Sequence, residues 1–207
     1  MASLSFSVTG VQDLKRLQAF LDPKLYAKAT RGGITYASKA VPPAVAKGIS
    51  SNYNIGSTRV KQDISRTQFV DGGQAALIGF SRRPPTLAQF KPNPGSRQPQ
   101  PGLGRGLGWG RPVKPGKPLT ATIIKGKGRQ IIPGAFLATG ASANRLVLRR
   151  TDNGSLQGVY GPSTGSIFLG NSAIGSQLRS DVQARINEQF IKGYQRVLDS
   201  AARGYGK

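Results

Sequence analysis

The side chains that could do chemistry in this 207-residue chain are mostly positive charges. It holds 30 Lys and Arg residues against eight Asp and Glu, and it has neither His nor Cys. Without His, the usual general base near neutral pH and the usual zinc ligand are missing. Without Cys there is no thiolate nucleophile, no disulfide framework and no thiolate metal site. We therefore expect a protein that is not an enzyme, with no catalytic residue, cofactor or metal.

One acid–base arrangement stays open, which is a pair of carboxylates brought together by folding. Asp63 and Asp181 are candidates for such a pair, as in a hydrolase. The other carboxylates have simpler structural interpretations: Asp22 as a helix N-cap before Pro23, and Asp71 as a turn residue. Glu188 and Asp199 lie off the apolar stripe of a predicted helix, as does Asp181, and are expected to be solvated.

The positive charge is concentrated in the middle of the chain. No Asp or Glu occurs between Asp71 and Asp152, and this stretch holds fourteen Lys or Arg residues, or +14 of the net charge of +22. Residues 1–71 carry +6 and residues 152–207 carry +2. These positive charges repel one another in a compact state. The stretch therefore favours a polyanion or an acidic protein surface beside it.

Within this acid-free stretch, residues 91–118 contain seven Pro, seven Gly and six basic residues. This composition predicts an extended basic arm inserted in a block of strands. The glycines match neither a P-loop nor a dinucleotide-binding fingerprint. The arm could contact nucleic-acid phosphates with Trp109 as a stacking group, dock on a neighbouring subunit, or be a solvated insertion. Ten residues are expected to face DNA or an acidic partner: Arg82, Arg83, Lys91, Arg97, Arg105, Arg111, Lys114, Lys117, Lys125 and Lys127.

Hydrophobic periodicity predicts the order of the elements. Helices are expected at 11–21, from Asp22-Pro23 to about residue 49 with a kink or break at Pro42-Pro43, at 58–62, and over a long C-terminal stripe from Ile174 to Gly204. Strands are expected at 4–8, 64–70, 75–80, 119–124, 130–138, 145–149 and 156–160, with a loop at 161–165. Segregated helices and strands predict an α+β fold. A single domain over 1–207 would combine a small, mostly antiparallel sheet with an N-terminal helical segment and the C-terminal helix. No run is apolar enough for a transmembrane helix.

The predicted strand 130–138 is interrupted by a Pro-Gly pair. Pro133 donates no hydrogen bond and suits a strand edge or bulge, while Gly134 permits an unusual turn. The segment is either a bulge in a sheet or part of a subunit interface. The interface candidates are Trp109, Pro133, Gly134, Ala135 and Phe136.

The Ile132–Phe136 segment (Ile-Pro-Gly-Ala-Phe), after a basic arm and before a strand hairpin, resembles the minor tail protein Z family of lambda-like tailed phages. The N-terminal part is similar too: residues 10–14 (Gly-Val-Gln-Asp-Leu) open a short helix and an Ala-rich helix follows. The basic turn at 59–61 and the long C-terminal helix fit the same order. The resemblance spans most of the chain.

The resemblance implies a virion structural protein: a tail-completion or neck component at the head-proximal end of the tail, made in the host cytoplasm. Its partners would be copies of itself in a ring, six-fold or twelve-fold, and tail terminator, tail tube or connector proteins. Genomic DNA would pass through the lumen, and no membrane is involved. The main alternative is a stand-alone nucleic-acid-binding protein, ribosomal or nucleoid-like, whose arm wraps DNA or RNA.

Overall fold

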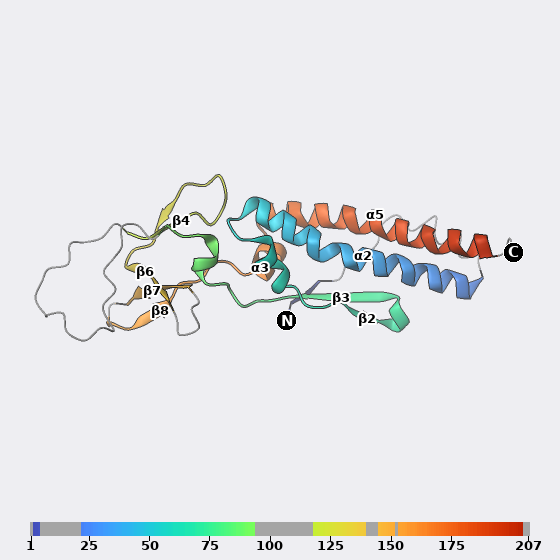
Figure 1. The fold of residues 1–207 in the computed structure, drawn as a ribbon, viewed down its shortest axis with the longest axis horizontal. Coiled ribbons are helices and arrows are strands. Elements are labelled where there is room, and N and C mark those ends of the chain that lie inside the picture. Colours follow the sequence, from blue (N-terminus) through green and yellow to red (C-terminus); the bar gives the residue numbers. More distant parts are fainter. Residues whose placement is uncertain (1, 5–21, 94–117, 140–144, 152, 205–207) are drawn as a thin grey trace, which may run out of the picture. The chain divides into compact units, whose positions relative to one another are not determined.

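The chain has an α+β fold that combines long helices with small antiparallel sheets, as predicted (Figure 1). The computed structural model describes residues 2–4, 22–93, 118–139, 145–151 and 153–204. The predicted helix at 11–21 and most of the basic arm lie outside these ranges. By its internal contacts the chain divides into two compact units: unit 1 (Met1–Ser50, Ser57–Arg82, Ser163–Lys207) and unit 2 (Ser51–Gly56, Arg83–Pro162). The single-domain organisation stays a prediction.

Unit 1 is built on two long helices, α2 (Pro23–Asn52) and α5 (Ala173–Gly204), which lie side by side (Figure 1). Asp22 caps α2 as expected, because its Oδ1 accepts a hydrogen bond from the backbone N–H of Lys24 at 2.9 Å. The stripe predicted for α5 is confirmed, since its central members are at most 5% exposed: Leu178, Val182, Ile186, Phe190 and Tyr194.

Two features of α2 differ from the sequence expectation. Pro42 and Pro43 neither end nor split the helix, which runs on to Asn52. Gly32 and Gly33, expected only to weaken it, lie where α5 comes closest. A Cβ atom on Gly33 would be 2.8 Å from the ring of Phe190, so a larger residue would push the helices apart. The glycines thus lower the helix propensity of α2 but allow the two helices to pack closely.

The remainder of unit 1 joins a three-stranded antiparallel sheet to two short helices. The sheet has the order β1 (Ala2–Leu4), β3 (Ala75–Phe80), β2 (Gln68–Val70), and the 3₁₀ turn η1 (Asp71–Gly73) joins β2 to β3, with Asp71 in the turn as predicted. Strand β2 is shorter than the predicted strand 64–70. Helix α3 (Ser57–Gln62) confirms the predicted basic turn. Helix α4 (Thr164–Leu169) overlaps the expected loop at 161–165, and Ser163 caps it by accepting a hydrogen bond from Ser166 N–H.

Unit 2 holds two small antiparallel sheets. One pairs β4 (Thr120–Ala121) with β5 (Gln130–Ile131), and the other has the order β6 (Ala135–Thr139), β7 (Arg145–Arg150), β8 (Leu156–Gly158). The 3₁₀ turn η2 (Leu87–Phe90) packs against β7. Its Leu87 and Phe90 are at most 1% exposed, so this small unit has its own core.

The predicted strand 130–138, interrupted by Pro-Gly, is two separate strands. Residues 132–134 form a turn, in which Ala135 N–H donates to the Ile132 carbonyl at 3.3 Å and Gly134 has a φ of +67°. The segments on either side belong to different sheets, because β5 pairs with β4 whereas β6 pairs with β7. Pro-Gly therefore separates two strands rather than making a bulge in one.

Candidate site: a buried carboxylate and an exposed basic surface

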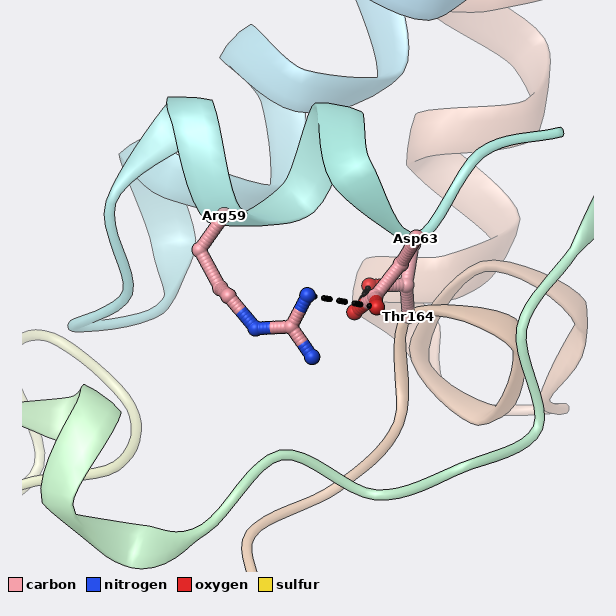
Figure 2. A network of polar contacts seen from close by, with 3 residues as sticks. All are labelled: Arg59, Asp63 and Thr164. Carbon is pink, nitrogen blue, oxygen red and sulfur yellow. Dashed lines mark hydrogen bonds and ion pairs between the residues drawn. The ribbon is translucent and has the colours of Figure 1, made fainter. Parts of the chain in front are cut away.

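Asp63 is the one carboxylate of the described residues that is buried, with 6% of its surface exposed. Figure 2 shows its side chain between Arg59 and Thr164. Arg59 Nη1 lies 2.8 Å from Asp63 Oδ1, and Thr164 Oγ1 donates a hydrogen bond of 2.9 Å to Asp63 Oδ2. Each carboxylate oxygen therefore has its own donor, which offsets the cost of burying the charge.

Three segments of unit 1 meet at this residue. Arg59 and Asp63 are four residues apart at α3, so the helical turn itself brings the pair together. The backbone carbonyl of Asp63 also accepts from Ser81 N–H at 2.7 Å, directly after β3. Thr164, 101 residues further along the chain, is the first residue of α4 and is 1% exposed. Asp63 thus anchors α3, the end of β3 and α4 to one another.

The geometry around Asp63 does not favour acid–base chemistry. The side chain facing Asp63 is a permanently charged guanidinium, which cannot act as a proton acceptor. Asp181, the other half of the hypothetical hydrolase pair, is exposed on α5 and accepts a hydrogen bond from Gln177 Nε2 at 2.8 Å. The two carboxylates have separate partners and separate structural roles, and we assign Asp63 an anchoring role.

Of the ten residues expected to face DNA or an acidic partner, five lie in the described ranges, and all five are exposed: Arg82, Arg83, Lys91, Lys125 and Lys127. Arg82 ends a segment of unit 1, and the other four belong to unit 2. Lys91 follows η2 in the left-handed region, with a φ of +51°. The other five lie outside the described residues: Arg97, Arg105, Arg111, Lys114 and Lys117.

Four further basic residues of unit 2 are also exposed: Arg129, Arg145, Arg149 and Arg150. Arg149 donates to Gln157 Oε1 at 3.3 Å across β7 and β8. None of these four was among the residues expected to face DNA or an acidic partner. The clustering of basic residues was already visible in the sequence, because all thirteen of unit 2 lie in the acid-free stretch between Asp71 and Asp152, and the fold adds that most of this stretch belongs to one compact unit.

The interface candidates occupy different surroundings. Pro133 and Gly134 are exposed in the turn between β5 and β6, Ala135 is 3% exposed, and Phe136 is partly exposed on β6. Trp109 lies outside the described residues.

The i, i+4 spacing of Arg59 and Asp63 is enough to predict that they form a pair, whereas no sequence signal connects either residue to Thr164.

Comparisons with protein-family models, with curated proteins and with solved structures found no match to this chain. Across the described ranges, no helix is both long enough and apolar enough to cross a membrane. In the same ranges, acidic side chains do not gather in groups of three or more that could hold a metal ion.

Proposed function

We propose that this chain is a structural component of a tailed-phage virion, a tail-completion or neck protein. In this role it forms a homo-oligomeric ring, six-fold or twelve-fold, at the head-proximal end of the tail. The ring joins the tail to the head around the DNA path. Its immediate neighbours are tail terminator, tail tube or connector proteins, and genomic DNA lies in the lumen.

The observation that carries this proposal is the division of charge between the two units. Unit 2 contains thirteen Lys or Arg residues and a single acidic residue, Asp152. Its described basic side chains are exposed, so their field reaches outward. The one described buried carboxylate, Asp63, is held by Arg59 and Thr164 and anchors segments of unit 1 to one another. The exposed positive charge of unit 2 and the anchoring role of Asp63 together favour an assembly role beside a polyanion.

The resemblance of the sequence to the minor tail protein Z family supports the same proposal and names its place in the virion. The α2–α5 pair supplies a stiff element for a subunit that must keep its shape. The basic unit supplies the surface that faces DNA or an acidic neighbour. Neither role requires a catalytic group.

The proposal is tested by the state of the purified protein and by its presence in particles. Light scattering and negative-stain microscopy should show closed rings, alone or with co-expressed neighbouring tail proteins. Mass spectrometry of purified virions should find the chain at a copy number that matches the ring. Its absence from virions that carry the other tail proteins would contradict the proposal.

A stand-alone nucleic-acid-binding protein is the second candidate, because exposed basic residues cluster at Lys125, Lys127 and Arg129. Binding to a duplex as a function of salt separates the two. A dedicated binder holds duplex DNA as a monomer, and its affinity falls steeply as salt rises. A ring-forming tail protein binds DNA weakly as a monomer. Tight monomeric binding would favour this second candidate.

A further inference from the structure

The sheet β6-β7-β8 has two faces of different character. Its register pairs Phe136 with Leu148, Ala138 with Leu146, and Arg150 with Leu156. Since side chains alternate between the faces of a strand, these six residues share one face. The opposite face holds Ala135 and Val147, which are 3% and 1% exposed, so that face is turned to the core of unit 2. We call the first the outer face.

The outer face is apolar although it is open to solvent. Phe136, Ala138, Leu146 and Leu148 are partly exposed, and Leu156 is 55% exposed. An antiparallel sheet with one solvated face normally carries polar residues there. Strand β7 instead reads Leu-Val-Leu over 146–148, apolar on both sides. This pattern is typical of a strand that is covered on both faces.

Charge lies at one end of this apolar face and on the opposite face. Arg150 lies on the outer face at one end of β7, whereas Arg145 and Arg149 are exposed on the opposite face, where they pair with Thr139 and Ala135. Unit 2 as a whole carries a net charge of +12. Among the described strands, β8 is at the edge of its sheet with β7 as its one neighbour, and residues 159–161 just after it are hydrogen-bonded to residues 85–87.

We propose that the outer face of β6-β7-β8 binds an extended segment of a partner protein in which apolar and acidic side chains alternate. The segment pairs with β8, its apolar side chains lie beside Leu156 on the outer face, and its carboxylates, on the opposite face, reach Arg149, whose guanidinium donates to Gln157 of β8. This inference goes beyond the proposed function, because it would hold for an assembly protein of any kind.

Charge complementarity selects this occupant over two others. A second copy of unit 2 placed face to face on this sheet would bring another +12 to the same place and be repelled, whereas neighbours in the proposed ring can meet through other surfaces. Single-stranded nucleic acid would match the charge, but its bases bind by stacking on aromatic rings. Phe136 is the one aromatic side chain among the six residues of the outer face, and apart from Arg150 the others are aliphatic.

The test uses the full chain and a fluorescein-labelled peptide of about ten residues, the length of a strand, in which Glu and Val alternate. Fluorescence anisotropy should show saturable binding. Leu156→Asp should weaken it about tenfold or more, because a charge would replace the most exposed leucine of the face. Leu77→Asp is the matched control, since Leu77 is a 40% exposed sheet leucine in unit 1, and it should leave binding unchanged. Arg149→Gln should weaken binding and flatten its salt dependence.

Several outcomes would overturn the proposal. One is equal binding by wild type and Leu156→Asp. Another is equal binding of a peptide with Ser in place of Val, which would leave charge as the only attraction. A third is an oligothymidylate that binds in a Leu156-dependent manner, which would make the outer face a nucleic-acid site. A fourth is a red shift of Trp109 emission in Leu156→Asp without peptide, which would identify residues 94–117 of this chain as the cover. Because Leu156 is exposed, the variant should fold, and circular dichroism verifies this.

Discussion

The backbones of Gly193 in α5 and Gly32 in α2 are in direct contact. A Cβ atom on Gly193 would lie 2.8 Å from the carbonyl oxygen of Gly32 and equally close to Cβ of Tyr36. Backbone atoms cannot shift to make room for this Cβ atom, as the end of a flexible side chain could. The close approach of α2 and α5 is therefore possible only because Gly193 and Gly32 carry a hydrogen atom in place of a side chain.

Gly193→Ala should lower the free energy of unfolding by about 1–3 kcal/mol, the usual effect of adding a methyl group to a packed interface. Urea denaturation measures this. Gly56→Ala is the control, because nothing lies within 4 Å of a Cβ atom there. The control should be neutral or slightly stabilising, since alanine restricts the unfolded chain. Equal stability of Gly193→Ala and wild type would contradict the close approach.

Thr164→Val should destabilise unit 1 by about 1–3 kcal/mol, because Asp63 Oδ2 would lose its buried donor while the side-chain volume stays similar. Chemical denaturation followed by circular dichroism measures the effect. The control is Glu188→Gln, which breaks a 3.1 Å pair with Lys192 in which both side chains are more than half exposed. That change should stay within about 0.5 kcal/mol. Similar losses in both variants would argue against an anchoring role for Asp63.

Tyr194→Phe should leave stability unchanged or raise it. Among the described residues, the Tyr194 hydroxyl is buried without a hydrogen-bond partner, while its ring packs against Phe190 and Tyr26. Removing the hydroxyl keeps the ring contacts and relieves an unpaired polar group. Thermal unfolding of the variant against wild type is the measurement. A loss above about 1 kcal/mol would mean that the hydroxyl has a partner such as an ordered water.

Alkaline pH should destabilise the fold through two tyrosines. Burial raises the pKa of Tyr53 above the ordinary 10.0, and burial, with a smaller contribution from Tyr26, raises the pKa of Tyr194. The folded state thus holds these protons more tightly than the unfolded state. Their contribution to stability is complete below pH 10 and is lost as pH rises through the folded-state pKa values. Absorbance at 295 nm should show Tyr53 and Tyr194 ionising last, and Tyr194→Phe should reduce the pH dependence of unfolding.

Sequence patterns predicted the parts of this fold that depend on local periodicity. The α5 stripe, the Asp22 cap and the basic turn at α3 follow from residue spacing alone. The role of Gly32 and Gly33 did not, because a glycine pair in a helix looks like a weak point until its partner Phe190 is known. The division of 130–138 between two sheets was also hidden, because a turn and a bulge both suit Pro-Gly. The Asp63–Thr164 bond joins residues with no local relation, and only the tertiary fold reveals it.

The separation of α2 from α5 in the chain has a consequence for synthesis. Helix α2 leaves the ribosome long before α5 exists, because residues 53–172 are translated between them. At bacterial rates this interval lasts roughly ten seconds. During it Gly33 has no Phe190 to pack against, and Val45 and Ile49, fully buried in the finished fold, lack their final packing. Nascent α2 thus exposes apolar side chains that the finished fold buries, and unit 1 reaches its native packing only after α5 is made.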